Sequence, residues 1–127
     1  MIKAAGTLAL CGALLLGGST PTLAAPHPKA RLKIVDGVKG GPVKSVWLHC
    51  GPVGGTHPHA QAACRLLKQV KGQPAKLNVT PKASCSQEIQ PHAVIIGGQW
   101  YGTKVRWAKF FPNACYMKAM GGQLLSL

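Results

Sequence analysis

Cysteine placement restricts the fold of this 127-residue chain more than any other sequence feature. Of its five cysteines, one lies close to the start, and Cys50, Cys64, Cys85 and Cys115 are spread over the rest of the chain. Four cysteines in a short exported chain typically form two disulfides that stabilise a small domain. Because four cysteines allow three pairings, their spacing leaves the connectivity open.

Residues 1–24 have the three parts of a secretory signal peptide: a positively charged start, a short apolar run and the small-residue cleavage site "TLA". We expect cleavage after Ala24, which removes Cys11 and leaves a secreted domain of residues 25–127. Residues 25–30 are rich in proline and charge and are expected to form a flexible arm. The sequence has no later apolar stretch of about 20 residues, so we expect no membrane segment.

Apolar and polar residues alternate in four segments, which predicts β-strands. These segments are residues 31–37, 43–50, 92–98 and 103–111. Helical periodicity and end signals predict a helix from about residue 58 to 71 and a short one over residues 113–121. The apolar tail, residues 123–127, is a candidate edge strand. Residues 73–92 form a long irregular segment, and loops of that length are usually functional or disordered.

The charge balance argues against an enzyme. The net charge of +13 becomes +12 once the signal peptide is removed, and Asp36 and Glu88 are the only acidic residues. They lie on different segments, so paired catalytic carboxylates are excluded. A Ser-His-Asp triad would have to use Asp36, which we place at the end of a strand beside the flexible arm. We therefore expect no catalytic residues.

One segment gathers five potential zinc ligands. They are His49, Cys50, His57, His59 and Cys64. Zinc accepts such ligands, but this spacing is not that of a zinc finger, and an exported chain favours oxidised cysteines. We therefore expect neither a metal nor another cofactor.

The positive charge favours acidic partners and supports a second hypothesis, a protein that binds a polyanion or the cell envelope. The basic residues are, however, spread along the whole chain. The aromatic residues Trp47, Trp100, Tyr101 and Trp107 fit strand or turn patterns, and they are not interleaved with basic residues as in a single-strand binder. Polyanion binding is therefore open but not favoured.

The irregular segment contains the stretch "ASCSQEIQPHAV", residues 83–94. If Cys85 pairs with Cys115, this loop is fixed near its middle, and Pro91 restricts its exit. An extended, exposed and tethered loop is what a protease inhibitor needs, because rigidity lowers the entropy cost of binding. An ordinary loop held by a disulfide is the alternative explanation.

Four segments of the chain together resemble the Streptomyces subtilisin inhibitor family. They are "SVWLHCGPVGGTHPHAQAAC", "SCSQEIQP", "GQWYGTKVRW" and "FFPNACYMKAMGG", and the similarity runs from about Ala30 to Leu127. The resemblance implies an α+β fold with a five-stranded antiparallel sheet and two helices, assembled as a homodimer through the sheets. It also implies disulfides Cys50–Cys64 and Cys85–Cys115.

The resemblance also implies a reactive site. Carried over by position, the reactive bond is Gln87–Glu88, with Gln87 entering the specificity pocket of a subtilisin-like serine endopeptidase. Around it, the resemblance assigns a binding loop and two supporting residues: Ser84, Cys85, Ser86 and Ile89 in the loop, and Asn113 and Pro91 as its support.

Three departures from the family pattern bear on the target. Gln87 stands where the family usually has Met, Lys or Arg, so trypsin inhibition should be poor and subtilisin inhibition weaker. Gln90 replaces the usual aspartate before Pro91, and the chain is basic where the family is commonly near neutral or acidic. These departures leave a shifted target open, for example a metalloprotease or a transglutaminase that accepts Gln87.

Overall fold

The computed structural model describes residues 27–127, so the predicted signal peptide lies outside the described residues. Five strands form one antiparallel sheet with the order β3-β2-β1-β4-β5. They are β1 (Ala30–Val38), β2 (Val43–Cys50), β3 (Gly54–Gly55), β4 (His92–Trp100) and β5 (Thr103–Phe111). The helices are α2 (Ala60–Gln69) and α3 (Ala114–Gly121), with 3₁₀ turns η1 (Pro74–Lys76) and η2 (Gly122–Leu125). The predicted α+β fold with five strands, two helices and two disulfides is confirmed.

The alternation in the sequence sets the two faces of the sheet. In β1, Ala30, Leu32 and Ile34 are fully buried, whereas the residues between them are exposed. Ile34 lies opposite Ile96 of β4, which is also fully buried. Side chains of successive residues point to opposite faces of a strand, so one face of the sheet is core and the other is open.

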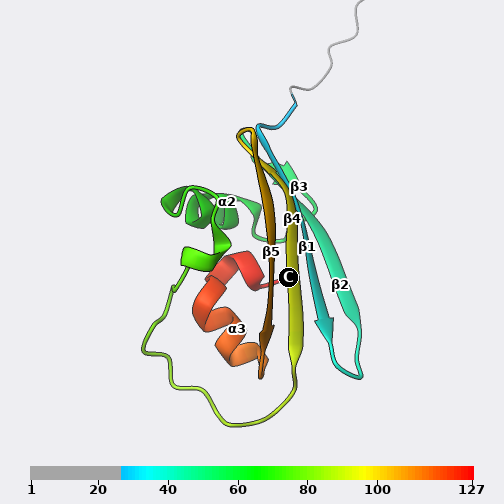
Figure 1. Ribbon diagram of the computed structural model, residues 1–127, viewed down its shortest axis with the longest axis vertical. Helices are drawn as coiled ribbons and strands as arrows, with labels where there is room; N and C mark the ends of the chain where they lie inside the picture. The colour runs from blue at the N-terminus through cyan, green and yellow to red at the C-terminus, as the bar shows by residue number, and fades with distance from the viewer. Residues whose placement is uncertain (1–26) are drawn as a thin grey trace, which may run out of the picture.

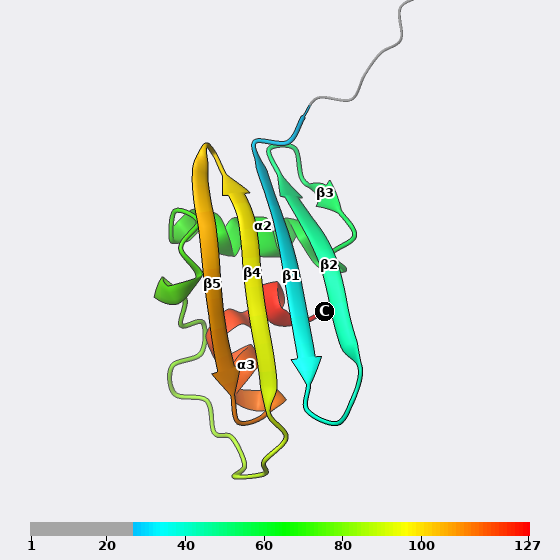
Figure 2. The same cartoon turned by 45° about the vertical axis from the view of Figure 1, so that its right-hand side comes forward.

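Both helices cover the same face of the sheet, and the opposite face is bare (Figure 1 and Figure 2). Ala63, Cys64 and Leu67 form the buried side of α2, as its periodicity predicts. The largest fully buried side chains come from both layers and are Leu32, Ile34, Leu48, Leu67, Ile96, Leu124 and Val94. No helix of residues 27–127 is long and apolar enough to cross a membrane.

Several predicted boundaries differ from the structure. The tail is not an edge strand: residues of η2 turn back under the helices, where Leu124 and Leu125 are buried. The fifth strand is instead the glycine pair Gly54–Gly55, which has no side chains from which alternation could be read. The helix α2 begins at Ala60, two residues later than predicted, because His59 has a non-helical backbone conformation and its N–H donates to His57 Nδ1.

The predicted arm and the position of Asp36 also need correction. β1 begins at Ala30, the last residue of the predicted arm, and the backbone of Lys29 already bonds to Gly51 and Tyr101. Asp36 lies within β1, close to the end of the strand that is farther from the arm. It is only 6% exposed. A strand register fixed on both sides therefore holds these residues in place.

Candidate functional site

A long segment without helix or strand joins η1 to β4 and projects beyond one end of the sheet (Figure 1). It is attached at both ends by backbone hydrogen bonds. Near its start, Thr80 N donates to Ala119 O of α3 at 2.7 Å. Near its end, Gln90 N donates to Pro112 O at 2.8 Å, and the Pro91 carbonyl accepts from Lys39 N at 3.0 Å. The segment therefore has fixed ends despite having no regular structure.

A disulfide holds the middle of this segment. Cys85 bonds to Cys115 in the first turn of α3, and their Cα atoms are 5.7 Å apart. The other disulfide joins Cys50 at the end of β2 to Cys64 of α2. Both expected pairings are thus confirmed.

Asn113 supports the same segment from beneath. Its Nδ2 group donates to Ser86 O at 3.1 Å and to Glu88 O at 2.8 Å, so one amide spans the Gln87–Glu88 peptide. Its Oδ1 atom accepts from Tyr116 N at 3.1 Å and caps the start of α3. Because Asn113 is only 6% exposed, this amide is held in place by the protein interior.

The peptide above Asn113 faces solvent. Ser84 and every residue from Ser86 to Gln90 are exposed, and Ile89 is 80% exposed, although it is apolar. Gln87 Nε2 lies 3.4 Å from the Tyr116 hydroxyl, a contact that is itself exposed. The geometry therefore presents a short stretch of backbone and side chains outward while fixing the backbone on both sides.

The family model for subtilisin inhibitor-like proteins matches residues 24–113. This chain belongs to the subtilisin inhibitor-like family. The family is one of protease inhibitors and not of enzymes, in agreement with the expectation from the charge balance.

Named relatives of this subtilisin inhibitor-like chain come from Streptomyces. A subtilisin inhibitor of Streptomyces violaceus is 35% identical over a match that covers 96% of this chain and 93% of the relative. A subtilase-type protease inhibitor of Streptomyces coelicolor is 31% identical, with 87% and 80% covered. Among solved structures, Streptomyces caespitosus sermetstatin in complex with Bacillus licheniformis subtilisin is similar in fold, with a TM-score of 0.61 and 24% identity; the match covers 77% of this chain and 98% of that one.

Three of the residues weighed as zinc ligands, Cys50, Cys64 and His57, have structural roles in this inhibitor-like domain. Cys50 and Cys64 are bonded to each other. His57 is buried, accepts a hydrogen bond from His59 N at Nδ1 and lies 2.8 Å from Leu124 O at Nε2. A backbone N–H can only donate and a carbonyl can only accept, so the proton of neutral His57 is on Nε2.

Burial lowers the pKa of His57 below the ordinary imidazole value. The hydrogen bond to Leu124 O acts in the opposite direction, and the neighbouring His59 adds to the lowering. His57 therefore fastens the C-terminal segment to the start of α2 in its neutral form.

Sequence reasoning missed a buried contact between Asp36 and His92. Their side chains meet at 2.8 Å between His92 Nδ1 and Asp36 Oδ1, and both residues are buried. His92 directly follows Pro91, the predicted exit of the loop. Asp36 is therefore a structural partner at the base of the loop, a role that no local pattern could reveal.

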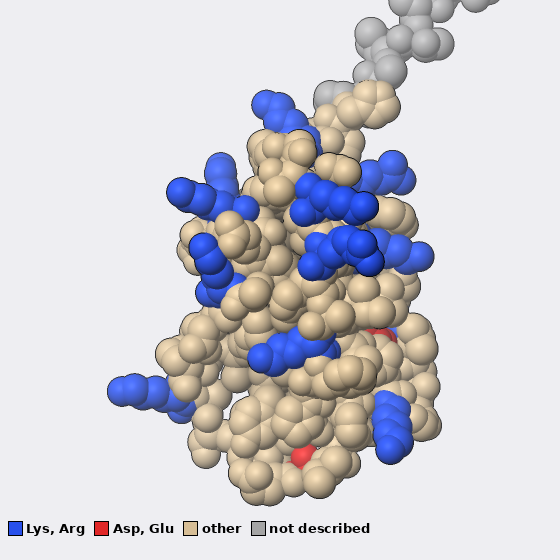
Figure 3. All heavy atoms as spheres, viewed as in Figure 1, with Lys and Arg blue, Asp and Glu red and all other residues tan. Residues whose placement is uncertain are grey.

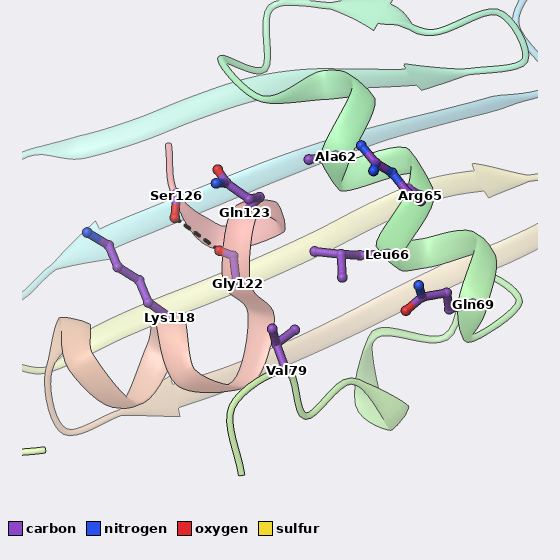
Figure 4. Close-up of a pocket in the computed structure, with 9 residues that line it drawn as sticks. All are labelled: Ala62, Arg65, Leu66, Gln69, Val79, Lys118, Gly122, Gln123 and Ser126. Carbon is purple, nitrogen blue, oxygen red and sulfur yellow. Dashed lines mark hydrogen bonds between the residues drawn. The ribbon is translucent and has the colours of Figure 1, made fainter. Parts of the chain in front are cut away.

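A groove of about 540 Å³ lies between α2 and the end of α3 (Figure 4). Leu66 and Val79 contribute apolar side chains, and Arg65 and Lys118 stand at its sides. None of the residues from Ser84 to Gln90 lines it. The groove is thus separate from the exposed loop.

Proposed function

We propose that this chain is a secreted inhibitor of subtilisin-like serine endopeptidases that offers Gln87–Glu88 as a substrate-like bond. The observation that carries the proposal is the Asn113 amide, which bonds to the carbonyl groups on either side of that peptide. The structural relative that binds subtilisin has the same fold.

The loop suits docking in a protease active site. Serine endopeptidases bind substrates in an extended form, through backbone hydrogen bonds at the edge of the site and a side chain in a pocket. Ser86 and Ile89 flank the proposed bond and are exposed, so a protease can reach the backbone there on the side away from Asn113, which holds Ser86 O. Because the loop is already ordered, binding costs less entropy than for a flexible peptide.

The same attachments favour inhibition over release of products. On one side of the proposed bond, Cys85 is covalently joined to α3. On the other side, Glu88 O is held by Asn113 and Gln90 N by Pro112 O. Both new ends would stay in the active site after cleavage, so the bond can be remade instead of the products diffusing away.

Gln87 sets the expected specificity. Its neutral amide offers no cationic anchor for trypsin, and a pocket that leaves the amide without partners loses about 1 to 3 kcal/mol. We therefore expect inhibition of subtilisin to be weaker than with Met at this position, and inhibition of trypsin to be negligible.

The decisive experiment titrates the purified mature domain against subtilisin and trypsin. The wild type should inhibit subtilisin, and Gln87→Lys should gain trypsin inhibition. Gln90→Lys is the matched control, because it adds the same charge to an exposed loop residue outside the proposed bond. If neither enzyme is inhibited by wild type or by Gln87→Lys, the proposal fails.

A shifted target is tested with the same material. A panel containing subtilisins, metalloproteases and a transglutaminase would show which enzyme the Gln87 loop fits. Stronger inhibition of a metalloprotease than of every subtilisin would move the assignment to that class.

Export is part of the proposal. Mass spectrometry of protein recovered from the culture medium of the producing cells should find an N-terminus at Ala25. Retention of the intact chain inside the cells would contradict secretion.

Homodimer formation is the last part of the proposal, and the bare face of the sheet supports it. Val43, Ile95 and Phe110 are 69%, 53% and 80% exposed, and register places them with Val35 on the loop-side half of that face. Burying such apolar surface favours self-association. Sedimentation of the wild type should give twice the mass of the chain, and Ile95→Asp should give the monomer. A monomeric wild type at high concentration would exclude this dimer.

A further inference from the structure

A pocket lies beside the turn between β4 and β5, at the end of the molecule opposite the exposed loop (Figure 1). We call it the turn pocket. It has a volume of about 340 Å³ and three walls: Trp100 and Tyr101 at the turn, residues 50–53 at the end of β2, and one side of α2. The open-face residues assigned to the dimer, Val43, Ile95 and Phe110, do not line it. Self-association through that face would therefore leave the turn pocket accessible.

The three walls of the turn pocket are tied together. The backbone of Lys29 bridges two of them, because its N–H donates to Gly51 O at 3.0 Å and its carbonyl accepts from Tyr101 N at 2.8 Å. The disulfide Cys50–Cys64 joins the end of β2 to α2. The pocket is thus preformed, as ligand pockets usually are. Its volume lies at the small end of their range of about 300 to 1,000 Å³, which suits one small molecule and not a polymer.

Tyr101 occupies a backbone position that disfavours a bulky side chain. It is the first central residue of the two-residue turn between β4 and β5, and the φ angles of Tyr101 and Gly102 are 45° and 85°. Asn-Gly is the preferred pair in such turns, and a bulky residue at positive φ costs backbone energy. The Tyr101 hydroxyl lies against Gly51, where an added Cβ would be only 2.7 Å away, yet Tyr101 is 49% exposed. Much of this costly aromatic side chain is therefore free to contact a ligand.

The α2 wall of the turn pocket is cationic. Arg65 and Lys68 are three residues apart, which places them on the same side of the helix, and both are exposed. None of the described residues that line the pocket is acidic. In Figure 3 the Lys and Arg atoms are more numerous over the half that carries the β4–β5 turn than at the loop end. The wall therefore favours an anionic group.

We propose that the turn pocket binds a small aromatic phosphate, a planar ring that bears one phosphate group, represented by a nucleoside monophosphate. The ring would stack on Tyr101, and Val53, which is 50% exposed, adds apolar surface to the same pocket. The phosphate oxygens would accept hydrogen bonds from Arg65 and Lys68, and the planar fork of Arg65 suits two of these oxygens. The inference goes beyond the proposed function and does not depend on it, because no residue of the loop lines the pocket.

The test titrates the isotope-labelled mature chain with adenosine monophosphate at constant ionic strength and follows the amide signals by NMR. The signals of Gly51, Tyr101 and Gly102 should shift and reach saturation, whereas those of residues 84–90 should stay in place. Ribose 5-phosphate, which lacks the ring, should bind about 5- to 100-fold more weakly. Adenosine, which lacks the phosphate, should also bind more weakly. Equal binding of either comparison ligand, or no saturable shift with adenosine monophosphate, would overturn the proposal.

Three variants localise the site. Tyr101→Asn removes the ring and suits the positive φ, so it should fold normally but bind adenosine monophosphate about 5- to 100-fold more weakly. Arg65→Gln with Lys68→Gln should weaken binding of the monophosphate and leave that of adenosine unchanged. Lys76→Gln with Lys118→Gln, the control, removes the same charge from exposed positions outside the pocket. Wild-type affinity in Tyr101→Asn, or equal weakening by the two charge variants, would reject the turn pocket.

Discussion

Asn113 Nδ2 lies 2.8 Å from Glu88 O, and it bonds at the same time to Ser86 O on the other side of Gln87. The same side chain caps α3 through Oδ1. Loop geometry and helix start are thus coupled through one amide.

Substitutions of Asn113 should therefore separate its effect on inhibition from its effect on the stability of α3. Asn113→Asp keeps the capping oxygen but loses both N–H donors, whereas Asn113→Ala loses both roles. Two hydrogen bonds are worth about 1 to 3 kcal/mol, so both variants should inhibit roughly 10- to 100-fold more weakly and be cleaved faster. Only Asn113→Ala should also lose about 1 kcal/mol of helix-cap stability. Inhibition constants and thermal unfolding measure the two effects, and wild-type inhibition by Asn113→Asp would contradict the supporting role.

The two disulfides should differ in function but not in stability. Their sequence separations are 14 and 30 residues, and by loop entropy each contributes about 3 to 4 kcal/mol. Replacing Cys85 and Cys115 by Ser should speed cleavage of the loop by the target protease. Replacing Cys50 and Cys64 should lower the melting temperature similarly and leave the intact folded protein as resistant as wild type. Equal cleavage rates in the two variants below their melting temperatures would show that the loop disulfide does not restrain the loop.

Glu88 places a lone negative charge in the exposed loop of a basic chain. Its Asn113 contact uses the backbone carbonyl, so Glu88→Ala keeps that bond. We expect a stability change within about 0.5 kcal/mol, as for other exposed positions, but a changed ranking of inhibited proteases. Gln90→Ala, at a neighbouring exposed position, is the control for the ranking. A large loss of thermal stability in Glu88→Ala would contradict the exposed placement.

The buried pair at the base of the loop gives a stability prediction. Asp36→Ala leaves His92 Nδ1 buried without a partner and should cost about 1 to 3 kcal/mol. Asp36→Asn keeps an oxygen that can accept from His92 and should restore most of that loss. Chemical denaturation measures all three proteins. If the Asn and Ala variants are equally unstable, the hydrogen bond is not the source of the effect.

Local sequence patterns predicted most strands and helices but did not predict the contacts between them. Alternation placed the four long strands, and the apolar side of α2 followed from periodicity, because both signals depend on burial of every second or every third to fourth residue. Gly54–Gly55 carries no such signal. The meeting of Asp36 with His92 depends on strand pairing, which local sequence does not encode.

The contacts of Asn113 show the same limit of local sequence patterns. An asparagine before a short helix is a recognisable cap signal, so the Oδ1 role of Asn113 was within reach of local reasoning. Its Nδ2 contacts join residues more than twenty positions apart and were expected only because the chain resembles a known family.

His57 gives a pH dependence with a defined sign. Burial lowers its pKa in the folded protein, whereas the unfolded chain has the ordinary value of about 6.5. The unfolded chain therefore takes up the proton first, so the stability from neutral His57 is complete above about pH 6.5 and is lost as pH falls through the folded pKa. Unfolding free energies at pH 7.5 and pH 5 should differ more in wild type than in His57→Gln. His27→Gln, which changes an exposed histidine, should keep the wild-type difference. Identical pH dependence in wild type and His57→Gln would show that His57 does not control acid stability.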